Sequence, residues 1–402
     1  MAKPTIRFKG YTDDWEQRKL LEFVSFFNGL TYTPDDVEET GTLVLRSSNV
    51  KNGEIVDADN VYVNDKAVTS ENVHEGDIIV VVRNGSRALI GKHAQIKASM
   101  PNTVIGAFMS GMRSEHSSFV NALLDTSAFE NEIAKNMGAT INQITGYMFS
   151  KMEFMIPSGD EQQKIGEHFQ SLDNLITLHQ RKCEETKILK KYMLQKMFPQ
   201  NGQKVPEIRF KGFTDDWEQR KLGDVLERRI EQRQQSEEYP RLAFASGQGV
   251  IPLSERKTNN REQLTKDEYT KKYLVTELND IVYNPANVKY GAIDRNKCGR
   301  GLISPIYVTF TTNEIPGFIE RIVTSHDFQQ RALRFEEGTV TKRQSVNPED
   351  LVTLDILVAP KREEQQKIAT YFDSLDHLIT LHQRKCEELQ NIKKFMLQNM
   401  FV

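Results

Sequence analysis

The sequence predicts an α+β protein built as an internal repeat: two globular mixed α/β domains separated by two long antiparallel coiled-coil helices, related by a pseudo-twofold axis. Three observations support this prediction: a short segment that occurs twice, a long amphipathic segment that occurs twice, and an ordinary globular composition. Of the 402 residues, 38% are hydrophobic and 27% are charged, enough for two or three domains with apolar cores. No apolar run approaches the ~18–20 residues of a membrane helix, so we expect no membrane partner.

The first repeated element lies near the start of the chain. Pro4–Leu20 recurs almost verbatim as Pro206–Leu222, with only Thr5 and Tyr11 replaced. Self-similarity at a fixed distance is the signature of a duplicated structural unit. Each copy therefore opens an equivalent domain.

The second repeated element is a helix. Glu161–Phe198 recurs as Glu364–Phe401, and both copies place apolar residues at alternating spacings of four and three. This spacing is typical of a coiled-coil seam, here on a helix roughly 55–60 Å long. We expect the two helices to pack on each other; the alternative is that each packs only on its own domain. The predicted helix-pair core is Ile165, Phe169, Leu172, Ile176 and Cys183 in the first copy, and Ile368, Phe372, Leu375, Ile379 and Cys386 in the second.

The segments between the repeats share almost no sequence. Clusters of β-branched and aromatic residues predict strands at 43–45, 61–63, 77–82, 280–283, 306–310 and 354–358, and residues 119–136 are expected to be helical. The predicted boundaries are a first domain at 1–157, a helix at 158–198, a linker at 199–205, a second domain at 206–360 and a second helix at 361–402.

The positive charge is unevenly distributed. The net charge is −3, yet no acidic residue occurs between Asp77 and Glu115, a stretch with five basic ones, and only Asp294 is acidic between Ile281 and Asn313. Local basic patches on an acidic chain concentrate the attraction for an anionic partner. The three cysteines do not form a disulfide framework and indicate a reducing cytoplasm.

The basic patches predict contacts with double-stranded DNA. Arg and Lys can bind guanine edges or phosphates, and Asn and Gln can pair with adenine; the alternative for any single residue is solvated surface charge. We expect DNA contacts from Arg46, Ser47, Asn49, Arg83, Asn84, Arg87, Lys92 and His93 in the first domain, and from Lys257, Asn284, Asn287, Lys289, Tyr290, Arg295, Lys297, Arg300, Lys342, Arg343 and Gln344 in the second.

Neither a catalytic nor a metal site is predicted. No phosphate loop, methyltransferase motif or nuclease motif is complete. His179 and Cys183 lie one turn apart, and His382 and Cys386 repeat them, so zinc is conceivable. Buried cysteine is nevertheless a common core residue, and both pairs lie on the apolar seam. We therefore expect no metal.

Two unlike domains on a duplicated frame have a functional advantage. A homodimer with one reading domain per protomer must recognise a palindrome, because its symmetry repeats the half-site. Two reading domains that are fused in one chain and have diverged can instead read two unrelated half-sites, with the helices setting the distance between them.

The chain resembles the specificity subunit of type I restriction–modification systems. The helix openings 157–165 and 360–368 are similar to the family's proline-to-Glu-Gln signature, and Trp15–Leu20 and Trp217–Leu222 resemble the element that begins each target-recognition domain. The resemblance implies a non-catalytic subunit that selects a bipartite, asymmetric DNA site with a fixed spacer. It implies two modification (methyltransferase) subunits that methylate adenine N6 with S-adenosylmethionine. Restriction subunits, with ATP and Mg²⁺, would add translocation and cleavage; this chain itself would hold no cofactor.

Two other classes of function remain open. The chain could be a coiled-coil scaffold without a role in DNA binding. It could also be a self-contained endonuclease, for which nicking by the isolated chain with Mg²⁺ would be decisive.

Overall fold

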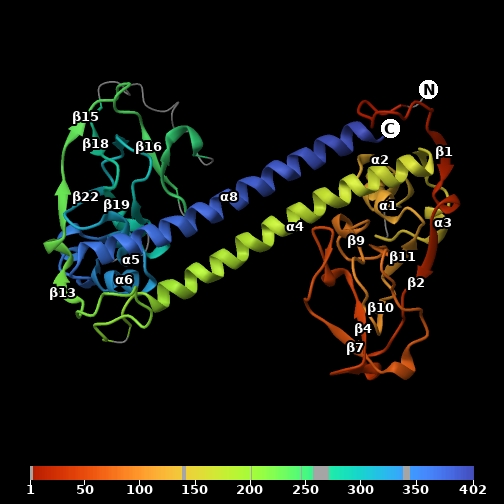
Figure 1. Cartoon of the computed structure of the whole chain (residues 1–402), viewed down its shortest axis with the longest axis horizontal. Helices are drawn as coiled ribbons and strands as arrows, with labels where there is room; N and C mark the ends of the chain where they lie inside the picture. The colour runs from red at the N-terminus through yellow and green to blue at the C-terminus, as the bar shows by residue number, and fades with distance from the viewer. Residues whose placement is uncertain (1–2, 138–141, 201, 246, 257–270, 338–344) are drawn as a thin grey trace. The chain divides into compact units, whose positions relative to one another are not determined.

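The computed structural model describes residues 3–137, 142–200, 202–245, 247–256, 271–337 and 345–402 and forms two compact units (Figure 1). Unit 1 comprises Met1–Arg181 and His382–Val402, and unit 2 comprises Lys182–Leu381. Each unit therefore contains one of the two variable domains together with part of each long helix.

Unit 1 is a mixed α/β domain with two four-stranded sheets, in the orders β2-β11-β8-β9 and β10-β4-β7-β3. Its strands are β1 (Glu16–Lys19), β2 (Ser25–Asn28), β3 (Val37–Glu38), β4 (Thr42–Leu45), β5 (Val50–Lys51), β6 (Glu54–Ile55), β7 (Val61–Val63), β8 (Ile78–Val81), β9 (His93–Gln95), β10 (Thr103–Ile105), β11 (Met109–Arg113) and β12 (Glu153–Ile156). Its helices are α1 (Ser117–Leu124), α2 (Ser127–Asn136), α3 (Gly146–Phe149) and the first part of α4 (Gly159–Lys196).

Unit 2 repeats the first of these sheets in the order β14-β22-β19-β20 and adds the sheet β15-β18-β21. Its strands are β13 (Glu218–Lys221), β14 (Leu226–Arg229), β15 (Gln232–Arg233), β16 (Leu242–Ala245), β17 (Gly249–Pro252), β18 (Tyr273–Thr276), β19 (Ile281–Tyr283), β20 (Ile293–Arg295), β21 (Gly301–Ile303), β22 (Val308–Thr312), β23 (Glu336–Glu337), β24 (Ser345–Val346) and β25 (Asp355–Val358). Its helices are α5 (Pro316–Val323), α6 (His326–Ala332), α7 (Pro348–Leu351) and the first part of α8 (Arg362–Met400).

The central sheets of the two units have the same register despite their different sequences. Ile78 of β8 pairs with Met112 of β11, and Ile281 of β19 pairs with Phe310 of β22. A buried aspartate precedes β8 and β19 at Asp77 and Asp280. Asp77 accepts two hydrogen bonds from Arg113 of the adjacent β11, and Asp280 accepts two from Arg229 of β14, which is one strand further away. A buried carboxylate is stable only when it is paired in this way. These positions therefore anchor the same frame twice.

The end of one long helix enters the core of each unit. In unit 1 Phe401, just after α8, lies edge-on to Trp15 with ring centroids 6.1 Å apart; in unit 2 Phe198, just after α4, lies edge-on to Trp217 at 5.6 Å. The backbone N–H of Ile6 donates to Asn399, and that of Ile208 donates to Lys196, both at 2.8 Å. The repeated N-terminal element is thus the platform on which a helix end packs.

The same element also holds the start of the other helix. Arg7 donates two hydrogen bonds of 2.7 Å to Glu161 near the start of α4, and Arg209 makes the same bidentate contact with Glu364 near the start of α8. Both glutamates are fully buried. Bidentate pairing satisfies a carboxylate that burial would otherwise make costly, which explains why these residues recur together.

The two helices are antiparallel within each unit, as predicted. In unit 1 Asp173 bonds to Lys393, and Ile176 accepts from Cys386; in unit 2 the Cys183 thiol donates to the Ile379 carbonyl. Nine of the ten predicted helix-pair core residues are buried, and Ile379 is half-buried.

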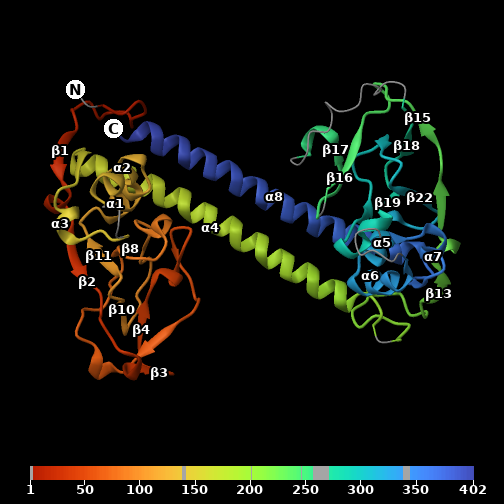
Figure 2. The same ribbon diagram turned by 180° about the vertical axis from the view of Figure 1, so that it is seen from behind.

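The alternative prediction, that each long helix packs only on its own domain, holds for part of the apolar stripe of each helix. Ile165 and Phe169 of α4 belong to the core of unit 1, and Ile368 and Phe372 of α8 belong to the core of unit 2. Figure 2 shows α5 and α6 against the start of α8. Each apolar stripe therefore serves both the domain and the partner helix.

Glycine permits the close crossing of a domain helix over each long helix. A Cβ on Gly166 of α4 would lie 2.7 Å from the backbone nitrogen of Phe119 in α1. In unit 2 the equivalent position is Ala369, and the glycine is on the opposite helix at Gly317, where a Cβ would lie 3.0 Å from the alanine methyl. One glycine at each crossing leaves enough room. This glycine lies on the long helix in unit 1 and on the domain helix in unit 2.

Two predicted elements differ in detail. The helix expected at 119–136 is interrupted, because Thr126 caps α2 by accepting from the Phe129 N–H and donating to the Leu123 carbonyl. The strand expected at 306–310 begins two residues later, because Ile306 lies in the turn that precedes β22.

Candidate nucleic-acid interface

The two units place an equivalent loop beside the central sheet. Residues 82–92 connect β8 to β9 in unit 1, and residues 284–292 connect β19 to β20 in unit 2. We call these the unit 1 loop and the unit 2 loop. Each closes through a glycine with left-handed backbone, Gly91 at φ 86° and Gly291 at φ 72°, a conformation that side chains disfavour. The same turn therefore presents different side chains in the two units.

In unit 1 the structure brings three of the predicted residues together. The Asn84 amide donates to the Ser47 hydroxyl at 3.2 Å, and the Lys92 ammonium donates to the Ser47 carbonyl at 3.2 Å. Ser47 follows β4, so the contact fixes the turn after β4 against the unit 1 loop. The sequence alone does not indicate this contact, since Ser47 and Lys92 are 45 residues apart.

The charges on the unit 1 loop are not neutralised. Within the described residues no carboxylate lies within 4.0 Å of Arg83, Arg87 or Lys92. Burial, and then the nearby Lys51, hold the pKa of Lys92 below its ordinary value. A lysine disfavoured by a like charge gains from an approaching anion such as phosphate. Sequence reasoning missed Lys51, although it lies only a few residues beyond Ser47.

Three other predicted residues of unit 1 are engaged within the protein. The Arg46 guanidinium donates to Asp59 at 2.6 Å, and the fully buried Asn49 amide donates to the Ala58 carbonyl at 2.7 Å. His93 is buried, with its Nε2 3.4 Å from Asp125. Asp125 overcomes the effect of burial and raises the pKa of His93. Their placement gives His93 and Asn49 structural roles.

In unit 2 three predicted basic residues are paired with carboxylates. Arg295 donates to Glu320 at 2.7 Å and to Asp373 of α8 at 2.8 Å, and Lys297 donates to the same Glu320 at 2.6 Å. Arg300 binds Glu238 and Glu277. The scarcity of acids near these residues in the sequence was misleading, because folding brings carboxylates from other elements. Arg295 and Lys297 thus tie β20 to α5 and α8, and this placement does not support their predicted DNA contacts.

The remaining predicted residues of unit 2 lie in or near its loop. Asn284 is buried, and its carbonyl oxygen accepts from the Ala286 N–H at 3.1 Å; Asn287 is half-buried and Tyr290 is exposed. The side chain of Lys289 and residues Lys257, Lys342, Arg343 and Gln344 lie outside the described residues.

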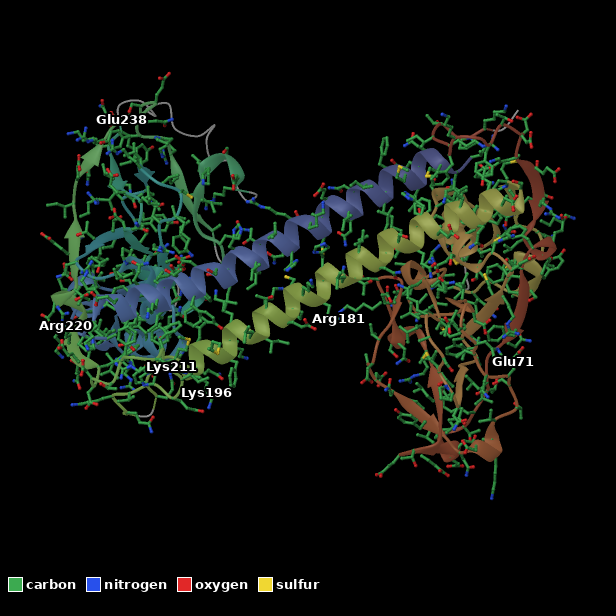
Figure 3. All side chains as sticks on the ribbon, viewed as in Figure 1. Glu71, Arg181, Lys196, Lys211, Arg220 and Glu238 are labelled. Carbon is green, nitrogen blue, oxygen red and sulfur yellow. The ribbon has the colours of Figure 1, made fainter. Side chains whose placement is uncertain are left out.

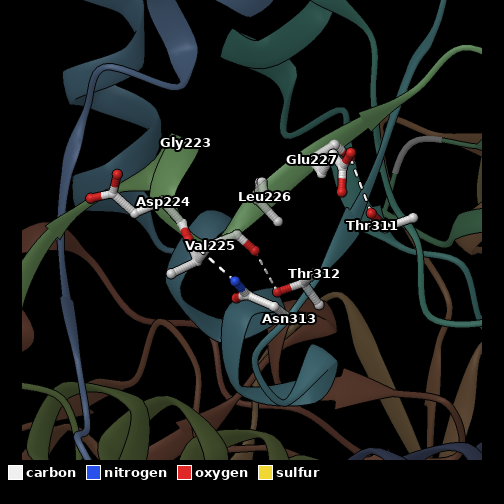
Figure 4. Close-up of a pocket in the computed structure, with 8 residues that line it drawn as sticks. All are labelled: Gly223, Asp224, Val225, Leu226, Glu227, Thr311, Thr312 and Asn313. Carbon is white, nitrogen blue, oxygen red and sulfur yellow. Dashed lines mark hydrogen bonds between the residues drawn. The ribbon is translucent and has the colours of Figure 1, made fainter.

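A pocket in unit 2 offers no catalytic arrangement. It measures about 410 Å³ and lies where β14 and β22 meet (Figure 4). Its polar side chains are bound to β14 and the turn before it: Thr312 donates to the Val225 carbonyl at 2.8 Å, and Asn313 donates to the Asp224 carbonyl at 3.3 Å. These bonds hold the strands together.

The zinc constellation considered above is not assembled in the described residues. No group of three or more His, Cys, Asp or Glu side chains there is placed to hold a metal ion. In unit 1 the Nδ1 atoms of His179 and His382 are 2.9 Å apart, and the Cys386 thiol points to the Ile176 carbonyl. The described helices also include none long and apolar enough to cross a membrane.

The long helices expose a second set of repeated side chains. Figure 3 shows side chains projecting from α4 and α8 around Arg181. Five large apolar residues of α4 are exposed, and four of them have an exposed apolar residue at the equivalent position of α8; Ile188 has no such counterpart. The four pairs are Leu175 and Leu378, Leu178 and Leu381, Leu189 and Ile392, and Tyr192 and Phe395. Exposed apolar surface that recurs in this way is typical of a protein–protein contact.

These features define an internally duplicated protein with two diverged modules, each with a loop at the same place beside its central sheet. The model of the type I restriction modification DNA specificity domain matches residues 12–187 and 214–391. The chain therefore belongs to this family, whose members supply DNA recognition and not catalysis, and assemble with methyltransferase subunits.

A solved structure shows the same fold. The chain is similar to the type I restriction–modification S subunit from M. genitalium, with 12% identity, a TM-score of 0.67 and coverage of 100% of this chain and 99% of the other. It also matches the HsdS subunit from Thermoanaerobacter tengcongensis, with 15% identity, a TM-score of 0.39 and coverage of 98% of each chain. No curated protein sequence matches the chain significantly.

Proposed function

We propose that the chain is the specificity subunit of a type I restriction–modification enzyme, in which each unit reads one half of a bipartite, asymmetric double-stranded DNA site. The observation that carries the proposal is the pair of loops at equivalent positions in two units of different sequence. Equivalent position gives each loop the same approach to DNA, and different side chains give each a different half-site. The helices α4 and α8 fix the spacer between the half-sites.

The exposed apolar residues of α4 and α8 support docking of two methyltransferase subunits. Because the residues recur at equivalent positions, two copies of one partner can bind the two helices by the same contacts. S-adenosylmethionine for adenine N6 methylation belongs to those partners in this proposal. ATP and Mg²⁺ belong to two restriction subunits, and the complex works in the cytoplasm.

The test is binding by the complex with its methyltransferase partner. The complex should protect one split sequence, with the affinity falling steeply as salt rises. Replacing Arg83 and Arg87 by Glu should abolish specific protection, while replacing the exposed Lys9 and Lys66 by Glu, an equal change in charge, should not. Wild-type binding that ignores sequence at every salt concentration would refute the proposal. Unchanged binding by the Arg83 and Arg87 variant would favour a scaffold without a DNA role.

A further inference from the structure

A tight turn beside each loop carries an exposed apolar side chain. In unit 1 the N–H of Met109 donates to the Gly106 carbonyl at 2.8 Å, and in unit 2 the N–H of Tyr307 donates to the Ser304 carbonyl at 3.0 Å. The third residue of the first turn is Phe108, 56% exposed, and the third residue of the second is Ile306, 62% exposed. The register of β11 and β22 makes these positions equivalent.

Each turn contacts the loop of its own unit. The Phe108 carbonyl accepts from the N–H groups of Val82 and Arg83 at 3.0 and 3.2 Å, and the Arg83 guanidinium lies over the Phe108 ring, 5.0 Å from its centroid. In unit 2 Tyr283, which precedes the loop, pairs with Val308, two residues after Ile306. A surface that binds the DNA through these loops would therefore include both apolar tips.

The recurrence of these tips requires an explanation. Single exposed apolar residues are common on protein surfaces. Here the two units have lost nearly all sequence similarity in this region, yet both keep a large apolar residue at the outermost turn position beside the loop. Among DNA-binding proteins, Phe and Ile side chains at such positions contact thymine methyl groups or wedge between base pairs.

We propose that Phe108 and Ile306 contact bases, one in each half-site, through their apolar surfaces. The inference rests on the proposed function and adds to it a contact that carries no charge. The Arg83 guanidinium covers one face of the Phe108 ring and holds it by a cation–π contact, which leaves the other face for a base. The two residues thus contribute to the choice of sequence, whereas Arg87 and Lys92 contribute to general attraction.

The salt dependence of binding distinguishes these roles. The complex with the methyltransferase is titrated with a duplex carrying its mapped site and with a scrambled duplex, over a range of salt. Phe108→Ala should weaken binding to the site about tenfold or more, leave binding to scrambled DNA unchanged, and leave the slope of log K against log salt unchanged. Arg87→Ala should lower that slope by about one phosphate contact on both duplexes.

Matched variants control for folding. Phe108→Leu should retain most of the affinity, because it keeps an apolar side chain. Val37→Ala and Leu278→Ala remove exposed apolar side chains elsewhere in the two units and should change nothing. Ile306→Ala should act on the other half-site in the same way as Phe108→Ala on the first.

Two DNA probes identify the base contact. Deoxyuridine in place of thymidine removes the methyl group. If Phe108 contacts that methyl group, the replacement weakens DNA binding by the wild-type complex and does not affect binding by the Phe108→Ala variant. The fluorescence of 2-aminopurine increases when the base is unstacked. If Phe108 inserts between base pairs, the wild-type complex should increase this fluorescence and the Phe108→Ala variant should not. Unchanged specific affinity of Phe108→Ala, or an equal loss on both duplexes, would overturn the inference. If the wild-type complex binds no specific sequence, the proposed function itself fails.

Discussion

Lys393 in α8 is paired with two carboxylates of unit 1, and its removal provides a quantitative test of the duplicated frame. Its Nζ lies 2.7 Å from Asp125 and 2.6 Å from Asp173, and the three side chains are 18%, 30% and 22% exposed. In unit 2 the equivalent Lys190 pairs with Asp376, but Asp376 also forms an ion pair with Arg321, with a nitrogen-to-oxygen distance of 2.9 Å. The two lysines therefore have the same role with different support.

Replacing Lys393 by Met keeps the alkyl stem and removes the charge. Breaking a fully buried ion pair costs about 3–5 kcal/mol; because water reaches these side chains in part, we expect a loss of about 2–3 kcal/mol in the stability of unit 1. Lys190→Met leaves Asp376 paired with Arg321, and we expect a loss of about 1 kcal/mol or less in unit 2. The same substitution should therefore cost the two units different amounts.

The two tryptophans allow each unit to be measured separately. Trp15 is buried in unit 1 and Trp217 in unit 2, and they are the only tryptophans of the chain. Urea unfolding followed by fluorescence in a Trp217→Phe background reports unit 1, and in a Trp15→Phe background reports unit 2. Burial already raises the pKa of Asp173, so loss of Lys393 should be partly relieved by protonation of Asp173 as the pH falls. Equal losses in both units, or a loss in unit 1 below about 0.5 kcal/mol, would refute the reasoning.

Three further predictions follow from the same contacts. Asp125 raises the pKa of the buried His93 above 6.5, so the charged form of His93 stabilises unit 1 at low pH. That stability should decline as pH rises from about 6.5 through the raised pKa, and His93→Gln should remove this decline from the urea midpoint. Gly166→Ala should destabilise unit 1 by about 1–3 kcal/mol in the Trp15 assay, because its Cβ would lie 2.7 Å from the Phe119 nitrogen, while Ser171→Ala on the exposed face of α4 should have almost no effect. Adding four residues to one long helix lengthens it by ~6 Å, so methylation mapping should show the spacer grown by about one or two base pairs with both half-sites kept; an unchanged spacer would mean that the helices do not set it.

The repeated frame could be predicted from sequence because its two copies are nearly identical. Pro4–Leu20 and the helix seams are constrained by contacts such as Arg7 with Glu161 and Trp15 with Phe401. Apolar spacing predicted that the two helices pair, and the duplication with its pseudo-twofold axis predicted that they are antiparallel. It could not show that the helix ends enter the domain cores, since Phe401 has no distinctive signal until Trp15 is seen beside it.

The charge around the candidate interface could not be predicted from sequence, for a physical reason. A sequence free of acids does not give a surface free of acids: Glu320 and Asp373 reach Arg295 from α5 and α8. Phe108 escaped notice because it and Ile306 are 198 residues apart, whereas the helices repeat at 203, so the turns fall out of register in the sequence. The available indication in the sequence was an aromatic residue, Phe108, in the turn just before a strand and not far from a basic loop.

The central claim is that two diverged units on one repeated frame each read their own half-site. It is tested most directly by mapping methylated adenines genome-wide in cells that carry the chain, and in cells that carry a chimera with residues 21–157 from another family member. The account predicts one split sequence for the natural chain, and for the chimera a change in one half with the other half and the spacer retained. A change in both halves, or methylation without a split sequence, would contradict it.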